Sequence, residues 1–130
     1  MGRVYVRLKT VSDGEGETLY GKGVYDYHRE NSIISFSSEN VSYKIILNES
    51  LIVVRKGEIS YELRFCAGET RDCEIATPYG SIPARLKTND LQVSLTPLRA
   101  EIRVEYTLIT GEVSATHSMN IAVLPITENK

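Results

Sequence analysis

The chain has 130 residues, with fifteen Lys and Arg against seventeen Asp and Glu, for a net charge of −2. This length suits one core, so we expect a single domain over residues 1–130. The mixed, nearly balanced charge excludes a strong basic field, and we expect no nucleic-acid partner. No run approaches the ~20 apolar residues of a membrane helix, and the alternating start differs from a signal peptide. We therefore expect no membrane association and a cytoplasmic location.

Apolar residues recur at every second position along most of the chain, which is the period of a half-buried strand. The clearest case is EISYELRF, where Ile59, Tyr61, Leu63 and Phe65 alternate with polar residues. Short polar loops with Gly or Asn separate such runs, and no helical period extends over eleven residues. In chain order, the runs cover residues 4–8, 41–47, 59–65, 91–95, 102–108 and 113–123.

Short strands joined by short loops predict an all-β, antiparallel fold. The nine or ten candidate strands are too many for a flat open sheet. We therefore expect an up-and-down β-barrel of about eight strands with extra short strands, because closure removes exposed edges. A two-sheet sandwich is the alternative. Gly21 and Gly23 inside one strand, and Pro83 inside another, favour the barrel because such residues mark bends, bulges and unpaired positions.

The stretch IATPYGSIPARLKT interrupts the alternation. The turn-forming residues of Thr77–Gly80 predict a hairpin corner. Ile75 and Thr77 in the strand before the turn then lie on the same face as the alternate residues from Ile82 to Thr88 in the strand after it. A corner at the mouth of a barrel would also place Tyr79 beside any ligand, or pack it in the core.

No motif points to catalysis. His28 and His117 are far apart in sequence and neither has a ligand-like neighbour, so we expect no metal, no cofactor and no catalytic residue. An enzyme is the least favoured class of function. Cys66 and Cys73 could face each other across a hairpin, but two free thiols are favoured over a disulfide, because small disulfide-dependent domains usually carry more cysteines.

Two polar residues fall on rows that face the interior. Arg55 shares its parity with Leu51 and Val53, which turns its guanidinium inward unless it lies beyond the end of the strand. A buried arginine requires a carboxylate or an anionic ligand as partner, and closure of the barrel end is favoured over ligand binding. His117 shares a row with Ala115 and Met119, where a core histidine is favoured over one that contacts a ligand.

Four segments together resemble a known family. They are GKGVYDYHRENSIISFSSE, VVRKGEISYELRF, ATPYGSIPARLKT and VEYTLITGEV. In order and spacing they are similar to the YwiB-like bacterial family, domain of unknown function 1934. This resemblance implies a calycin-like, lipocalin-type β-barrel in a bacterial cytoplasm and no established activity. Calycins often close one barrel end with an arginine over an aromatic ring, and because this chain has no Trp, a tyrosine would take that role.

Three classes of function remain open. The favoured one is a binding module for a small amphipathic or anionic molecule, inside the barrel or at its mouth. The second is a solid barrel that acts as a protein-interaction or homodimer module, and the third is an enzyme with a polar site at the mouth. The candidate ligand-binding residues are Arg55, Tyr61, Thr77, Tyr79, Thr88, Tyr106 and His117.

Overall fold

The computed structural model describes residues 2–126, which form ten β-strands and no helix. The fold is therefore all-β, as predicted. None of these residues forms a helix of the length and apolarity that a bilayer crossing requires. The strands are β1 (Gly2–Ser12), β2 (Glu15–Asp26), β3 (Ser32–Ser38), β4 (Val41–Leu47), β5 (Leu51–Lys56), β6 (Ser60–Phe65), β7 (Thr70–Thr77), β8 (Gly80–Leu95), β9 (Ala100–Thr110) and β10 (Val113–Pro125).

The strands close into one antiparallel up-and-down barrel. Each strand pairs with its neighbours in the chain, and β1 pairs with β10 to complete the ring. The predicted barrel is confirmed, but the expectation of about eight strands is wrong because the ring contains ten. Two of the ten strands bend. The larger ring can therefore flatten, so that side chains still fill the space inside it.

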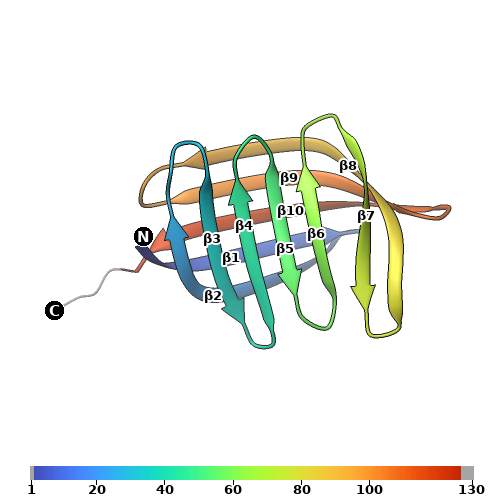
Figure 1. Cartoon of the computed structure of the whole chain (residues 1–130), viewed down its shortest axis with the longest axis horizontal. Helices are drawn as coiled ribbons and strands as arrows, with labels where there is room; N and C mark the ends of the chain where they lie inside the picture. Colours follow the sequence, from blue (N-terminus) through green and yellow to red (C-terminus); the bar gives the residue numbers. More distant parts are fainter. Residues whose placement is uncertain (1, 127–130) are drawn as a thin grey trace.

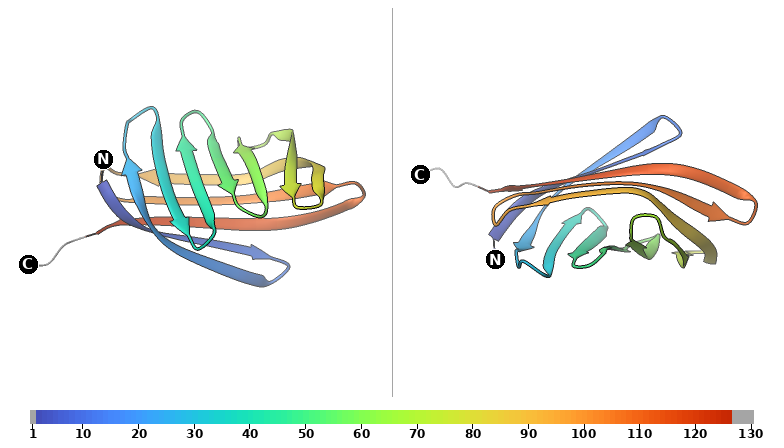
Figure 2. Two further views of the ribbon diagram at one scale, coloured as in Figure 1. Left: turned by 60° about the horizontal axis from the view of Figure 1, so that its bottom comes forward. Right: turned by 90° about the horizontal axis from the view of Figure 1, so that it is seen from above.

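Figure 1 shows the flattened shape as two layers whose strands cross. Strands β3 to β7 form one layer, and β1, β9 and β10 form most of the other, as the view from above in Figure 2 also shows. The long strands β2 and β8 bend and pass from one layer to the other. Corners of this kind require a bulge or a local bend in the strand.

Each corner has a local cause in the sequence. In β2, a Cβ on Gly23 would lie 1.9 Å from the carbonyl oxygen of Ser35, and a Cβ on Gly21 would lie 2.6 Å from that of Ser37. Only glycine therefore lets β2 approach β3 so closely. In β8, the register against β9 shifts between Thr88 and Asp90. The two glycines, where the sequence predicts a bend or a bulge, allow this close approach, and the register shift in β8 accompanies the second corner.

Apolar side chains fill the space between the layers. The core includes Ile34, Ile45, Val53, Ile102 and Ile121, each with an exposed fraction of zero. One end of the barrel is tied by Tyr25, whose hydroxyl donates to the carbonyl oxygen of Thr96 in the β8–β9 turn at 2.8 Å. Most of the inward-facing polar side chains gather elsewhere, on β4 to β6 and β8 to β10.

Candidate functional site

Tyr43, Arg55 and Tyr61 form a row across three strands, which we call the arginine row. Arg55 on β5 is the direct cross-strand partner of Tyr43 on β4 and of Tyr61 on β6. Its Nε donates to the Tyr43 hydroxyl at 3.0 Å, and its guanidinium lies 5.9 Å from the centre of the Tyr43 ring. Its Nη1 donates to the carbonyl oxygen of Ile59. The structure thus shows an arginine packed over a tyrosine, as the resemblance implied.

The charge of Arg55 has no carboxylate partner. The side chain is half-buried, and no Asp or Glu oxygen in residues 2–126 lies within the 4.0 Å that defines an ion pair with it. Its two hydrogen-bond acceptors are a neutral hydroxyl and a backbone carbonyl. An inward guanidinium without a carboxylate is an arrangement that an anion stabilises.

A second row lies on β8, β9 and β10, and we call it the Tyr106 row. Tyr106 is the direct cross-strand partner of both Thr88 and His117. The Tyr106 ring stacks on the imidazole of His117, with centroids 5.2 Å apart, and meets the ring of Phe65 edge-on at 5.0 Å. These contacts hold Tyr106 in place within the barrel.

Two hydroxyls of the Tyr106 row belong to buried residues and have no protein partner. Tyr106 is 5% exposed and Thr88 is 1% exposed, yet neither hydroxyl makes a hydrogen bond to the described part of the chain. Among those residues, Oδ1 of Asn120 is the only fully enclosed side-chain polar atom without a partner. The two hydroxyl oxygens therefore border some open space. Because an unmet hydroxyl costs about 1–3 kcal/mol, water or a ligand group is expected there.

The two rows face each other across the interior. Burial raises the pKa of Tyr61, and the nearby hydroxyls of Tyr43 and Tyr106 raise it further. Burial, together with Tyr43, raises the pKa of Tyr106 to about 12. Tyrosines from β4, β6 and β9 thus approach one another and stay protonated at neutral pH. They act as hydrogen-bonding groups and not as bases.

His117 is half-buried at the edge of the Tyr106 row. Burial lowers the pKa of its imidazole, and Asp13 in the β1–β2 turn offsets part of that effect. The imidazole is therefore mainly neutral at neutral pH and presents a flat polar face beside Tyr106. This placement confirms that His117 faces inward, as its row predicted.

Thr77 and Tyr79 lie apart from these rows, at the tip of the β7–β8 hairpin. Thr77 Oγ1 donates to the carbonyl oxygen of Gly80 at 2.8 Å and accepts from the Tyr79 amide at 3.1 Å, while Gly80 has a φ of 124°. The Tyr79 side chain is 99% exposed. The predicted corner is confirmed, with Ile75 paired to Ile82. Thr77 serves the turn, and Tyr79 does not reach the interior.

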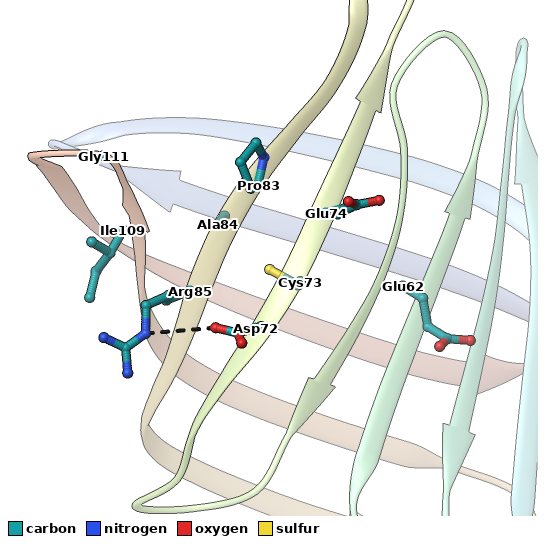
Figure 3. A pocket seen from close by; sticks show the side chains of 9 residues that line it. All are labelled: Glu62, Asp72, Cys73, Glu74, Pro83, Ala84, Arg85, Ile109 and Gly111. Carbon is teal, nitrogen blue, oxygen red and sulfur yellow. Dashed lines mark ion pairs between the residues drawn. The ribbon is translucent and has the colours of Figure 1, made fainter.

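A surface pocket lies where β6 and β7 separate (Figure 3). These strands pair at only two positions, next to Tyr61, and Glu62 and Glu74 line the pocket from either side. Burial and the charge of Asp72 raise the pKa of Cys73, so its thiol is a poor nucleophile.

Cys66 and Cys73 are free thiols, which agrees with the expectation of two thiols instead of a disulfide. Among residues 2–126, no three His, Cys, Asp or Glu side chains gather as metal ligands.

Five of the seven candidate residues thus belong to the two rows: Arg55, Tyr61, Thr88, Tyr106 and His117. The sequence-based selection missed Tyr43, which orients Arg55. The signal for it was present in the chain. The short connection between β4 and β5 sets Leu47 opposite Leu51, and counting back from that pair places Tyr43 opposite Arg55.

Comparisons with known proteins agree with this architecture. A family model described as "Domain of unknown function (DUF1934)" matches residues 7–121. The chain belongs to this family. No curated protein matches it. A similar solved structure is the crystal structure of the ywiB protein from Bacillus subtilis, with a TM-score of 0.76 and 20% sequence identity, covering 96% of this chain and 91% of that one. At this identity the likeness supports the barrel fold alone.

Proposed function

We propose that this DUF1934 protein binds a small anionic molecule between the arginine row and the Tyr106 row. The observation that carries the proposal is Arg55, a half-buried, inward guanidinium without a carboxylate partner. Arginine presents a planar fork of donors that matches a carboxylate or a phosphate. An anion at Arg55 would provide the charge partner that the chain itself does not supply.

The surroundings of Arg55 suggest a ligand with an apolar or aromatic body. The stacked rings of Tyr106 and His117 offer a flat surface, and the unpaired hydroxyls of Tyr106 and Thr88 offer hydrogen bonds. Leu108, next to this row on β9, is half-buried and adds apolar surface. Pockets for small ligands commonly combine an apolar lining with a few well-placed polar groups. The ligand class is therefore a small amphipathic carboxylate or phosphate ester.

A thermal-shift screen tests this proposal. The panel contains carboxylates and phosphate monoesters, each beside its neutral amide or alcohol. A ligand at about 100 times its Kd stabilises by about 2.7 kcal/mol and raises Tm by several degrees. We expect at least one anion to raise Tm, and its neutral counterpart to have little effect.

Two variants show where the anion binds. Arg55→Met should abolish the shift while circular dichroism shows that the barrel still folds. Arg64→Met removes an exposed arginine from the neighbouring strand and should keep the shift. If no anion shifts Tm, or if the shift survives in Arg55→Met, the proposal is wrong.

A further inference from the structure

The outer surface of β1, β2 and β10 carries unusually large apolar side chains for a solvent-facing wall. Tyr20 is 69% exposed, Leu124 is 49% exposed and Tyr5 is 48% exposed. They line one surface pocket together with Ala122. A contiguous apolar patch on the outside of a folded protein commonly marks an interaction site. We call this surface, which extends onto β9 at Glu101, the outer face.

Two opposite charges of the outer face flank Ala122, and a third charge, that of Lys22 on β2, lies over the Tyr5 ring with its Nζ 5.8 Å from the ring centre. Arg7 on β1 and Glu101 on β9 are the two cross-strand partners of Ala122 on β10, one on each side. Since adjacent strands lie about 4.8 Å apart, the backbones at Arg7 and Glu101 are roughly 10 Å from each other. Neither side chain makes an ion pair within residues 2–126.

We propose that the outer face binds a second copy of this chain as a symmetric dimer. A two-fold axis that runs along β10 above Ala122 exchanges the β1 side with the β9 side. Arg7 of each copy then lies opposite Glu101 of the other, and the symmetry forms this ion pair twice. The face is thus complementary to itself, which is the property of an isologous interface.

The small side chain at the centre of the outer face also favours a second copy of the chain as the partner. The axis passes over Ala122, whose methyl group lets the two sheets approach closely. Leu124 lies two residues along the same strand and would meet its own copy. Tyr5 pairs with Leu124 across the sheet and adds an aromatic ring next to that contact. An apolar centre flanked by charged residues is a common arrangement in protein interfaces. This inference is independent of Arg55 and of any ligand.

Charge reversal with rescue tests the dimer. Sedimentation velocity and native mass spectrometry would compare wild type, Arg7→Glu, Glu101→Arg and the double variant. Each single change replaces two attractions with two repulsions, so it should weaken the dimer by about tenfold or more. The double variant restores opposite charges and should recover dimer formation to nearly the wild-type level. Lys44→Glu, on the outer side of β4, is the matched control and should leave the dimer unchanged.

The outcomes are decisive in both directions. Dimerisation that fails in each single variant and returns in the double variant supports the proposal. A wild-type protein that stays monomeric at its solubility limit overturns it. A dimer that is insensitive to both single changes also overturns it, because the second copy then binds elsewhere. Circular dichroism of every variant checks that the barrel is intact.

Discussion

Replacing Gly23 with alanine tests the corner that sets the shape of the barrel. The new Cβ would lie 1.9 Å from the Ser35 carbonyl oxygen and 2.7 Å and 2.9 Å from Cβ and Cα of Phe36. These neighbours belong to a paired strand, so no flexible side chain can swing aside. Because real Cβ atoms essentially never come closer than 3.0 Å, β3 would have to move away from β2 by more than 1 Å.

The expected loss of stability follows from the strand pairing that this movement disturbs. Strands β2 and β3 pair over five positions, from Lys22–Ser37 to Asp26–Ile33. Overpacking a core costs about 1–3 kcal/mol, and each weakened hydrogen bond costs about 1 kcal/mol. We therefore expect Gly23→Ala to lower the free energy of unfolding by about 3–5 kcal/mol, a large fraction of the roughly 5–15 kcal/mol typical of a domain.

Urea unfolding followed by circular dichroism measures this loss. Gly16→Ala is the matched control in the same strand, because its new Cβ would have no neighbour nearer than 3.7 Å. Its stability should stay within about 0.5 kcal/mol of wild type. If Gly23→Ala were also within about 1 kcal/mol of wild type, the close approach of β2 to β3 would be wrong.

Two further predictions concern candidate residues at the edges of the barrel. Tyr79→Ala should change the free energy of unfolding by less than about 0.5 kcal/mol, because the ring is exposed, whereas Thr77→Ala should cost about 1 kcal/mol by removing two turn hydrogen bonds. Urea unfolding compares them, and a larger loss in Tyr79→Ala would contradict the placement of that ring. Burial lowers the pKa of His117 below its ordinary value of 6.5, so the unfolded chain takes up a proton at a higher pH than the folded protein. As the pH falls below about 6.5, wild type should therefore lose more stability than His117→Gln does. Equal slopes of Tm against pH in the two proteins would contradict a buried His117.

The barrel was predictable because alternation and hairpin loops are local signals. The two-residue connection between Thr110 and Val113, for example, fixes the pairing of Tyr106 with His117. These signals also indicate nine or ten candidate strands, but the number of strands that close into one ring was not predictable from them. That number depends on how β2 and β8 bend. The register shift in β8 falls at Asn89, between Thr88 and Asp90, where the polar residues predict a loop between two strands but the structure has one continuous strand, Gly80–Leu95.

The candidate site was predictable only in part, for a related reason. The alternation of side chains along each strand predicts that Arg55, Tyr61, Tyr106 and His117 face the interior, but it treats each strand separately. Which inward residues meet across the barrel depends on the crossing of the two layers, which involves strands far apart in the sequence. Tyr79 lies in a corner next to an inward row, which predicts a place at the barrel mouth, yet a residue at a hairpin tip does not have to follow the alternation of either strand.

Arg55 is expected to receive its anionic partner from outside the chain. The most direct measurement is the side-chain Nε–Hε resonance of Arg55 in ¹⁵N-labelled protein, assigned by its loss in Arg55→Met. Titrations would use benzoate, phenyl phosphate and octanoate, each beside its neutral amide or alcohol. At least one anion should shift this resonance to saturation, while its neutral counterpart should not. An unmoved Arg55 resonance with all three anions, or an equal response to the neutral compounds, would contradict this expectation.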